Sequence, residues 1–422
     1  MRKWGWIVMC GMLILCGCEK KEMSAEVRES TEGTTLAIAA DLHYLSPSLT
    51  DRGTLFTQTV LHADGKMTAC SEELTEAFVQ QILSEEVDCL ILPGDLTFNG
   101  ERQSHQKLAE KLRRIEQSGT QVLVLPGNHD LNNPQALSYQ GDQAYKTTSA
   151  DGEEFARIYQ EFGYDEALSR DGASLSYTAQ VNDRLRILMI DVNTAEASGQ
   201  LKQQTCQWIA EQLKAAAEDG VRLITVSHQN LLQHNALFVE GFRMEGADLL
   251  LGLMEHEGVL CHLSGHLHLQ HQALSEMGLR EIVTSSLAVS PHQYGLLRLC
   301  QDHADYAVRQ TDVAAWAAQT GSHDEALLNF AQTSRQFFLA NAWRQAMDSL
   351  EDTLVHRRMA LFFAEVNTAY FAGRLDQLSW DEELYSQWLQ ENNALSLYLS
   401  SVAQEKTENQ TAAQWIVPSR KE

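Results

Sequence analysis

Five short clusters of carboxylate, imidazole and carboxamide side chains stand in this sequence, each directly after an apolar run. In chain order they are Asp41-Leu42-His43, Gly94-Asp95, Gly127-Asn128-His129-Asp130, Ser227-His228 and Gly265-His266-Leu267-His268. Side chains of these types bind first-row divalent metal ions, and they suit copper or a thiolate zinc site less well. The clusters therefore indicate chemistry that uses a metal ion.

Each cluster alone is a weak signal, because short motifs of Asp and His occur often by chance. The third cluster is stronger, since Gly127 permits a tight turn that exposes the polar side chains after it. All five occur in order, and each follows an apolar run of the kind that forms a strand. Loops at the carboxyl ends of strands are where an α/β sheet gathers a site, so we expect the clusters to meet.

The elements that must position these clusters follow from the hydrophobic pattern. Apolar runs predict strands at 36–40, 87–92, 122–125, 185–190, 223–226 and 296–299. Helical periodicity predicts helices at 71–85, 101–117, 153–162 and 201–218. Strands that alternate with helices predict a layered α/β domain.

The pattern changes after residue 305. Residues 306–422 contain two glycines and one proline, but five of the eight tryptophans. Ser322 and Glu325 have the spacing of a capping box at the start of a long helix, and Gly373 suits the end of another. We therefore predict a small helical C-terminal domain over 306–422, with a frayed end from residue 404.

The length and charge of the chain narrow the class of protein. Its 422 residues, 44% of them hydrophobic, are enough for two or three domains with buried cores. The formal net charge of −25 disfavours binding to a nucleic-acid polymer. A small phosphate ester is still allowed as a substrate, because bound metal ions reverse the sign of the local field.

The first residues have the features of an export signal. Two basic residues precede an apolar run over 4–16, which is shorter than the ~20 residues that a spanning helix needs. The ending Leu15-Cys16-Gly17-Cys18 resembles the lipobox of bacterial lipoproteins and implies lipidation of Cys18. We expect a signal peptide over 1–17, a tether over 18–34 and an extracytoplasmic protein that touches the membrane only through this lipid anchor. An ordinary secretory signal cleaved nearby is the alternative.

In their order and spacing, the five clusters resemble the motifs of the calcineurin-like metallophosphoesterase superfamily, over residues 36–299. The resemblance implies a four-layer αββα sandwich at 35–305, followed by the helical domain. It also implies two divalent metal ions, which would be manganese, iron or zinc. The implied ligands are Asp41, His43 and His268 for the first ion, Asn128, His228 and His266 for the second, and Asp95 for both.

The same resemblance implies that His129 is the catalytic histidine and that Asp130 orients its ring. Two positions depart from the pattern. Leu131 stands where many members have an arginine that would hold the phosphate, and Gln229 stands where many have a second histidine.

Three longer segments carry a closer resemblance. GDLTFNGERQSH, EEFARIYQEFGYDEALSRDGASLSY and SSLAVSPHQYG are similar to surface-anchored cyclic-nucleotide phosphodiesterases of Gram-positive bacteria. This resemblance implies hydrolysis of 3′,5′-cyclic nucleotides at the cell surface, by a hydroxide that bridges the two metal ions. Asn99, His105 and Tyr294 are the candidate substrate contacts that it implies.

Two other functions stay open on the sequence. A broader phosphohydrolase for nucleotides, phospholipid head groups or wall polymers would use the same metal ligands. A non-catalytic surface binding protein would be expected to lack one of the ligands or His129, and the sequence lacks none of them.

Overall fold

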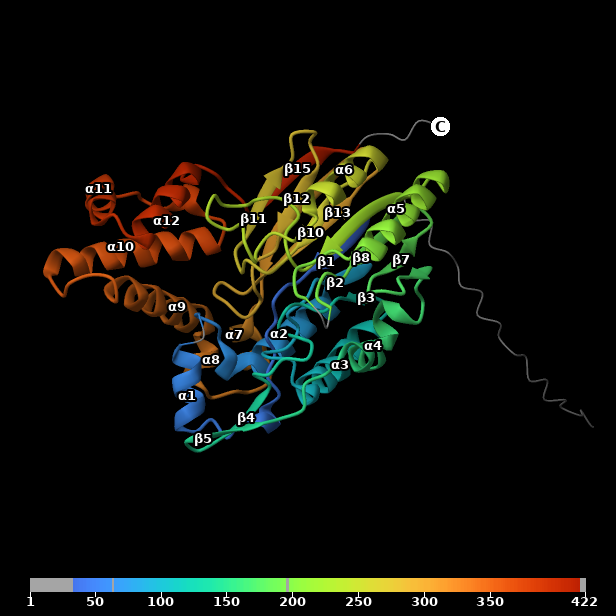
Figure 1. Cartoon of the computed structure of the whole chain (residues 1–422). Coiled ribbons are helices and arrows are strands. Elements are labelled where there is room, and N and C mark those ends of the chain that lie inside the picture. The colour runs from blue at the N-terminus through green and yellow to red at the C-terminus, as the bar shows by residue number, and fades with distance from the viewer. Residues whose placement is uncertain (1–32, 63, 195–196, 418–422) are drawn as a thin grey trace, which may run out of the picture. The chain divides into compact units, whose positions relative to one another are not determined.

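Two β-sheets lie face to face, and helices cover the outer face of each (Figure 1). The computed structural model describes residues 33–62, 64–194 and 197–417. The predicted signal peptide and Cys18 lie outside the described residues. Within the described part of the chain, no helix is both long enough and apolar enough to cross a bilayer.

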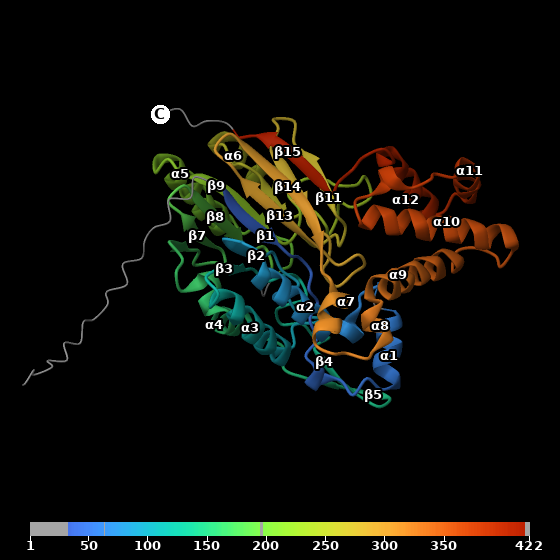
Figure 2. The same ribbon diagram turned by 180° about the vertical axis from the view of Figure 1, so that it is seen from behind.

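The first sheet contains six strands in the order β15-β14-β13-β1-β2-β3. Its strands β1 to β3 are parallel, whereas β13, β14 and β15 are added antiparallel beside β1 (Figure 2). β2 is buried along its whole length, as expected for a parallel strand that is covered on both faces. The strands are β1 (Thr34–Ile38), β2 (Cys89–Leu92), β3 (Gln121–Val124), β13 (Gln293–Leu299), β14 (His303–Gln310) and β15 (Ala412–Ile416).

The second sheet contains seven strands in the order β11-β12-β10-β9-β8-β7-β6. Its central strands β8, β9, β10 and β12 are parallel. The strands are β6 (Ser169–Arg170), β7 (Tyr177–Asn182), β8 (Leu185–Ile190), β9 (Arg222–Ser227), β10 (His262–Ser264), β11 (His271–Leu274) and β12 (Arg280–Val283). A separate hairpin consists of β4 (Leu137–Gln140) and β5 (Gln143–Lys146).

The helices complete the layers. Apolar side chains of α2 (Ser71–Ser84) and α3 (Arg102–Glu116) pack on the first sheet, and those of α5 (Gln203–Glu218) and α6 (Ala247–Glu257) pack on the second. This order of layers confirms the predicted αββα sandwich. Shorter helical segments are α1 (Thr54–Leu61), α4 (Gly152–Ile158), η1 (Pro47–Leu49), η2 (Thr68–Cys70) and η3 (Gln160–Tyr164).

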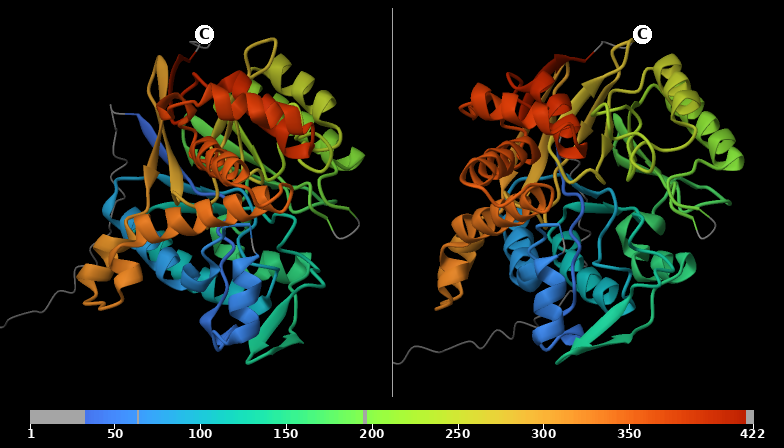
Figure 3. Two further views of the ribbon diagram at one scale, coloured as in Figure 1. Left: turned by 90° about the vertical axis from the view of Figure 1, so that its left-hand side faces the viewer. Right: turned by 60° about the vertical axis from the view of Figure 1, so that its left-hand side comes forward.

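The C-terminal region is helical, as predicted, and α9 and α10 lie side by side in it (Figure 3). Its core surrounds the fully buried Trp388 and includes Leu267 and Leu269, which flank His268. The helices therefore pack directly against the loop that carries the last polar cluster. They are α7 (Val313–Gln319), α8 (Glu325–Leu328), α9 (Phe330–Met347), α10 (Leu354–Phe371), η4 (Leu375–Gln377), α11 (Glu382–Glu391), α12 (Ala394–Val402) and η5 (Ala403–Glu405).

Two predicted details of this region are wrong. α8 has only four residues and its N-cap is Asp324 rather than Ser322, so the long helix begins later, at Phe330. Residues 412–416 do not fray, because they pair with β14 as strand β15 and satisfy the hydrogen-bonding groups along its edge. Gly373 does follow the end of α10 with a φ of +68°, as predicted.

Candidate metal centre

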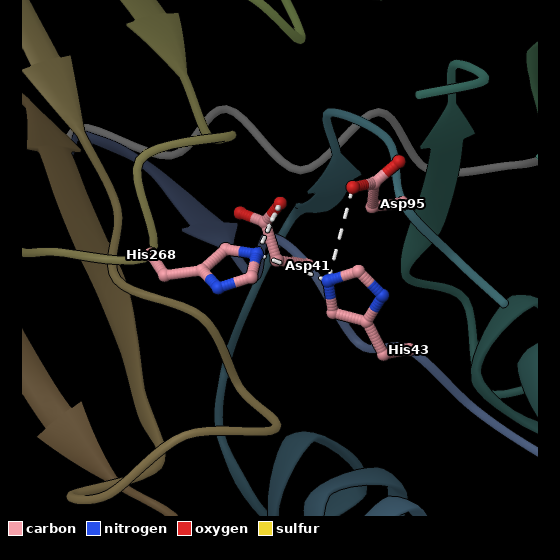
Figure 4. Close-up of side chains that lie close together, drawn as sticks. All are labelled: Asp41, His43, Asp95 and His268. Atoms are coloured by element: carbon pink, nitrogen blue, oxygen red, sulfur yellow. Dashed lines mark hydrogen bonds and ion pairs between the residues drawn. The ribbon is translucent and has the colours of Figure 1, made fainter. Parts of the chain in front are cut away.

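Four side chains from three of the clusters form the first group of ligand atoms. These atoms, from Asp41, His43, Asp95 and His268, all lie within 4.8 Å of one another (Figure 4). Nε2 of His43 is 3.0 Å from Nε2 of His268 and 3.7 Å from Oδ2 of Asp95. Nε2 of His268 is 3.6 Å from Oδ1 of Asp41. Buried imidazole nitrogens that converge with two carboxylates form a donor set that fits a divalent metal ion.

A second group shares Asp95 with the first. It consists of Asp95, His228 and His266. Nε2 of His228 is 3.4 Å from Oδ2 of Asp95, 3.2 Å from Nδ1 of His266 and 3.0 Å from Oδ1 of Asn128. The structure therefore places the seven predicted ligands in two adjacent groups with one common carboxylate, which is the arrangement that a pair of ions requires.

The backbone at the strand ends turns sharply to present these side chains. Asp41, His43, Asp95, His266 and His268 all have a positive φ, between 42° and 71°. This conformation is strained for residues other than glycine, and such strain gathers at functional sites. Hydrogen bonds hold the turns in place, including one of 3.0 Å from the amide of His266 to Asp41 and one of 3.0 Å from the amide of His43 to the carbonyl of Asp95.

The Gly127 position allows the third cluster to approach the shared carboxylate. A Cβ atom at this position would lie 2.2 Å from Oδ1 of Asp95. No side chain fits there, so the glycine of the motif is required by close packing and not by its φ.

The charges of the two groups act on one another. Burial alone would raise the pKa of Asp95, but His228, His129 and His43 hold it well below the usual range. Burial would lower the pKa of His228, and Asp95 beside it raises that pKa to about 9. Burial raises the pKa of Asp41 to about 7. The site thus concentrates negative charge on Asp95, where both groups meet.

His129 lies at the mouth of the site and its ring is held from one side. Nδ1 lies 2.9 Å from the carbonyl oxygen of Phe98 and 3.1 Å from Oδ1 of Asn99. Two acceptors at Nδ1 require this nitrogen to carry hydrogen. Nε2 remains on the side of the metal ligands, 4.0 Å from Oδ2 of Asp95. The ring is therefore fixed in the orientation that a proton donor to the site needs, and Asn99 is part of its support.

The predicted role of Asp130 is corrected by its contacts. Its buried carboxylate accepts hydrogen bonds from the amides of Leu96, Thr97 and Gly127, and from the Thr97 hydroxyl, at 2.8 to 3.0 Å. These donors surround the carboxylate, so it braces two loops and does not orient the His129 ring.

Two of the three predicted substrate contacts are also corrected. His105 is fully buried, with Nδ1 2.9 Å from the Tyr159 hydroxyl and Nε2 3.0 Å from the carbonyl oxygen of Asp130. Tyr294 is fully buried and its hydroxyl donates to Glu85. Both side chains form part of the buried interior and do not face a substrate, because each polar group already has a protein partner. Of the three, only Asn99 lies beside the metal centre.

The two departures from the motif pattern are packed into the protein. Gln229 is 1% exposed and exchanges hydrogen bonds of 2.9 and 2.8 Å with Asn193. Leu131 packs against the main core. Neither side chain is available to a substrate phosphate.

Lys66 is a site residue that the motifs did not reveal. It is 7% exposed, and after burial its charge is the largest influence that lowers the pKa of both His43 and His268. Its backbone pairs with Val289 in an isolated bridge. Because the segment before η2 has no motif and Val289 is distant in sequence, nothing in the sequence indicated this cation.

Phe242 is a second residue that the motifs did not reveal. Its ring lies 5.7 Å from the ring of His266 and 5.1 Å from that of Phe238. The carbonyl of Gly241 lies 2.8 Å from Nε2 of His266. The sequence held one signal for this residue. Phe238 and Phe242 stand four residues apart in a segment where neither a helix nor a strand was predicted.

Two family models match the chain in separate regions. The model for calcineurin-like phosphoesterase matches residues 34–270, and the model for the C-terminal domain of cyclic nucleotide phosphodiesterase matches residues 312–409. A comparison with curated proteins finds no match.

Several solved structures are similar to the chain at low sequence identity. A dimetal phosphatase from Danio rerio is 15% identical, with a TM-score of 0.48, and the match covers 66% of this chain and 97% of that one. A purple acid phosphatase from yellow lupin is 14% identical, with a TM-score of 0.43 and coverage of 66% and 51%. A putative 5′-nucleotidase from Staphylococcus aureus is 11% identical, with a TM-score of 0.39 and coverage of 64% and 51%.

The calcineurin-like phosphoesterase model covers more than half of the chain. All seven predicted metal ligands fall within the matched residues, and the structure brings them together around Asp95. The chain therefore belongs to the calcineurin-like phosphoesterase family, and it is a metallophosphoesterase.

Proposed function

We propose that this phosphoesterase hydrolyses 3′,5′-cyclic nucleotides to nucleoside monophosphates. The observation that carries this substrate class is the match of residues 312–409 to the C-terminal domain of cyclic nucleotide phosphodiesterase. The matched helices share a core with Leu267 and Leu269, on either side of His268. The region that suggests the substrate thus packs against the metal centre.

Two divalent ions fit the donor set. His43, Asp41 and His268 would hold one, while Asn128, His228 and His266 would hold the other, and Asp95 would contact both. When bound, such ions lower the pKa of a coordinated water and neutralise the charge of phosphoryl oxygens.

His129 supplies the proton that the reaction needs. The leaving alkoxide of a phosphodiester is a strong base and leaves readily only when it is protonated. Phe98 and Asn99 hold the proton on Nδ1, so a second proton on Nε2 faces the ligand cluster. The main-chain amide of His129 also donates to Asp95, which fixes the position of this residue relative to both groups of ligands.

The surroundings of the metal centre suit the two ends of a cyclic nucleotide. The buried Lys66 lowers the pKa of both His43 and His268 through its charge, and such a charge would favour the negative charge of a phosphate. The half-buried ring of Phe242 lies on the side of His266, and base stacking on an aromatic ring is worth about 1–3 kcal/mol.

The proposed location is the outer face of the cell membrane, with a lipid on Cys18. Its support is the sequence alone, from the apolar run over 4–16 and the residues that follow it. Labelling with a radioactive fatty acid tests it: native protein should become labelled and Cys18→Ser should not.

A turnover assay of the purified protein with added manganese tests the substrate. The substrates are cyclic AMP, a diester of p-nitrophenol and the monoester p-nitrophenyl phosphate. We expect cyclic AMP to be preferred, and His129→Ala to lower its kcat by roughly 100-fold or more. His256→Ala, at an exposed position on α6, serves as the matched control and should leave the rate unchanged.

The other outcomes separate the remaining functions. Turnover of the aryl diester without turnover of cyclic AMP would reject the substrate class and favour a broader phosphohydrolase. Turnover of none of these esters with manganese, iron or zinc would reject the proposed substrate class.

A further inference from the structure

A third group of metal-ligating side chains lies at the opposite end of the first sheet from the metal centre. Its members are Cys300, His303 and Asp305, and their ligand atoms all lie within 4.8 Å of one another. The pairing of β1 with β13 places Leu299 beside Thr34, at the start of β1. The predicted ligands of the first cluster follow the other end of β1, so the two sites are separate.

Strand pairing brings the three side chains of this group together. β13, β14 and β15 lie side by side at one edge of the sheet (Figure 2). Leu299 pairs with Ala304, and the amide of Cys300 donates to the carbonyl of His303 at 2.9 Å, so these two residues stand opposite each other. Asp305 lies two residues after His303 on β14 and therefore on the same face.

The ring of His303 is held in the orientation that a metal ligand needs. Nδ1 lies 2.6 Å from Oδ1 of Asp302, and Nε2 lies 3.3 Å from Oδ2 of Asp305. A carboxylate at one ring nitrogen fixes the tautomer of a metal-ligating histidine and leaves its other nitrogen for the ion. The distance at Nε2 suits zinc, because two donors that are each ~2.0–2.1 Å from a tetrahedral ion are roughly 3.3 Å apart.

The other two ligands are also positioned by contacts within the protein. Gln414 on β15 donates from its amide to Oδ1 of Asp305 at 2.7 Å, which leaves Oδ2 beside His303. Arg222 on β9 fixes the turn, since Nη1 donates to the carbonyl of Cys300 at 2.7 Å and Nη2 donates to the next carbonyl along the chain. The three side chains are therefore placed before an ion arrives, which favours binding.

An ion in solution can reach this group. The side chains of His303 and Asp305 are 37% and 42% exposed, and Cys300 is half-buried. Thiolate, imidazole and carboxylate are each common ligands of zinc, and a thiolate disfavours magnesium, calcium and manganese. Three protein ligands leave one of four tetrahedral positions to a water molecule.

We propose that Cys300, His303 and Asp305 bind one zinc ion, in a site separate from the metal centre. The ion binds Sγ of Cys300, Nε2 of His303 and Oδ2 of Asp305, and the thiol proton passes to solvent when the thiolate binds. The bound ion ties the turn after β13 to β14, and Gln414 extends this link to β15. The proposal does not depend on the proposed function, because the two sites share no ligand.

Cobalt(II) used as a probe for zinc tests the proposal on the full chain under reducing conditions. A thiolate bound to cobalt gives a charge-transfer band in the near ultraviolet, and none of the seven predicted ligands of the metal centre is a cysteine. We expect this band in the native chain, and we expect Cys300→Ser to abolish it. Cys70→Ser, at the other half-buried cysteine, is the matched control and should keep the band.

A variant of the metal centre keeps the two sites distinguishable. Asp95→Asn changes the carboxylate that both groups of predicted ligands share, and it should leave the thiolate band intact. Loss of phosphoesterase activity in this variant, with the band retained, would therefore concern the metal centre alone. Thermal unfolding confirms that each variant is folded.

Displacement of the cobalt band by zinc measures the affinity of the site. Asp302→Asn should weaken zinc binding by about ten-fold or more, because it removes the carboxylate that holds the His303 ring. Asp183→Asn, at an exposed position in the turn between β7 and β8, is the matched control and should bind zinc normally.

Three results would overturn the proposal. They are a native chain without the thiolate band, a band that persists in Cys300→Ser, and a cobalt band that zinc does not displace. An unchanged zinc affinity in Asp302→Asn would overturn the assignment of Nε2 of His303 as the ligand atom.

Discussion

The main-chain amide of His129 donates a hydrogen bond of 2.8 Å to Oδ1 of Asp95. The other oxygen of Asp95 faces His228 at 3.4 Å and His43 at 3.7 Å. One carboxylate thus joins the two ligand groups and also fixes the backbone of the residue that we assign as proton donor. The two groups of predicted ligands and the proposed proton donor therefore meet at Asp95.

Asp130, next to the proposed catalytic histidine, should act on stability rather than on the histidine ring. Asp130→Asn places an amide NH₂ among three main-chain donors, and we expect a loss of roughly 2–4 kcal/mol in the free energy of unfolding. Urea denaturation measures this loss, with Asp183→Asn at an exposed position as the control. A variant with native stability but a reduced kcat would contradict the bracing role. It would instead support the role of orienting the His129 ring.

Lys66 should contribute to substrate binding through its charge. Because the charge of Lys66 lowers the pKa of both His43 and His268, we expect Lys66→Met to raise the KM for a phosphodiester by about ten-fold, with a smaller change in kcat. Lys66→Arg should retain part of the affinity, whereas Lys146→Met, at an exposed position on β5, should behave as the native protein does. An unchanged KM in Lys66→Met would reject a role of this charge in substrate binding.

Phe242 should contribute to recognition of the base. Phe242→Ala removes the ring beside His266, and we expect kcat/KM for cyclic AMP to fall by about ten-fold. The inhibition constant of inorganic phosphate, which has no base, should stay the same. Leu237→Ala, an exposed position in the same segment, is the control. Equal losses for cyclic AMP and phosphate would instead indicate damage to His266.

Glu281 should make stability depend on acid pH. Burial would raise its pKa, but His234, His262 and the Ser264 hydroxyl lower it to about 2, from an ordinary value of 4.5. The native carboxyl therefore binds a proton less readily than the unfolded one does. The resulting contribution of Glu281 to the free energy of unfolding is about 3 kcal/mol. This contribution is complete above pH 4.5 and is lost as the pH falls toward 2.

Urea unfolding of the metal-free protein at several pH values measures this contribution. Glu281→Gln removes the titrating group, so the stability difference between native and variant protein should shrink as the pH falls below 4.5. A difference that is constant between pH 6 and pH 3 would show that Glu281 does not carry the dependence.

The sequence indicated the metal centre because its signals are local. Each ligand follows an apolar strand by one to five residues, and strands of a parallel sheet end at the same edge. The predicted cores of β1, β2, β3, β8, β9 and β13 lie where those strands lie in the structure. The change of composition after residue 305 likewise predicted the helical region.

Several contacts could not be predicted, because they join residues distant in sequence. Asp130 braces two loops because the adjacent amides of Leu96 and Thr97 and the amide of Gly127 all donate to it. His105 and Tyr294 are buried because their polar groups have partners in other parts of the chain. The pairing of β15 with β14 also depends on where the helical region returns the chain.

Local pattern, in sum, determined which side chains form the metal centre and which elements carry them. Only the tertiary structure decided what surrounds that centre, because Lys66 and Phe242 are positioned by contacts between distant segments. Residue type and spacing specify the ligands of a metal ion, whereas packing between layers specifies what reaches the substrate.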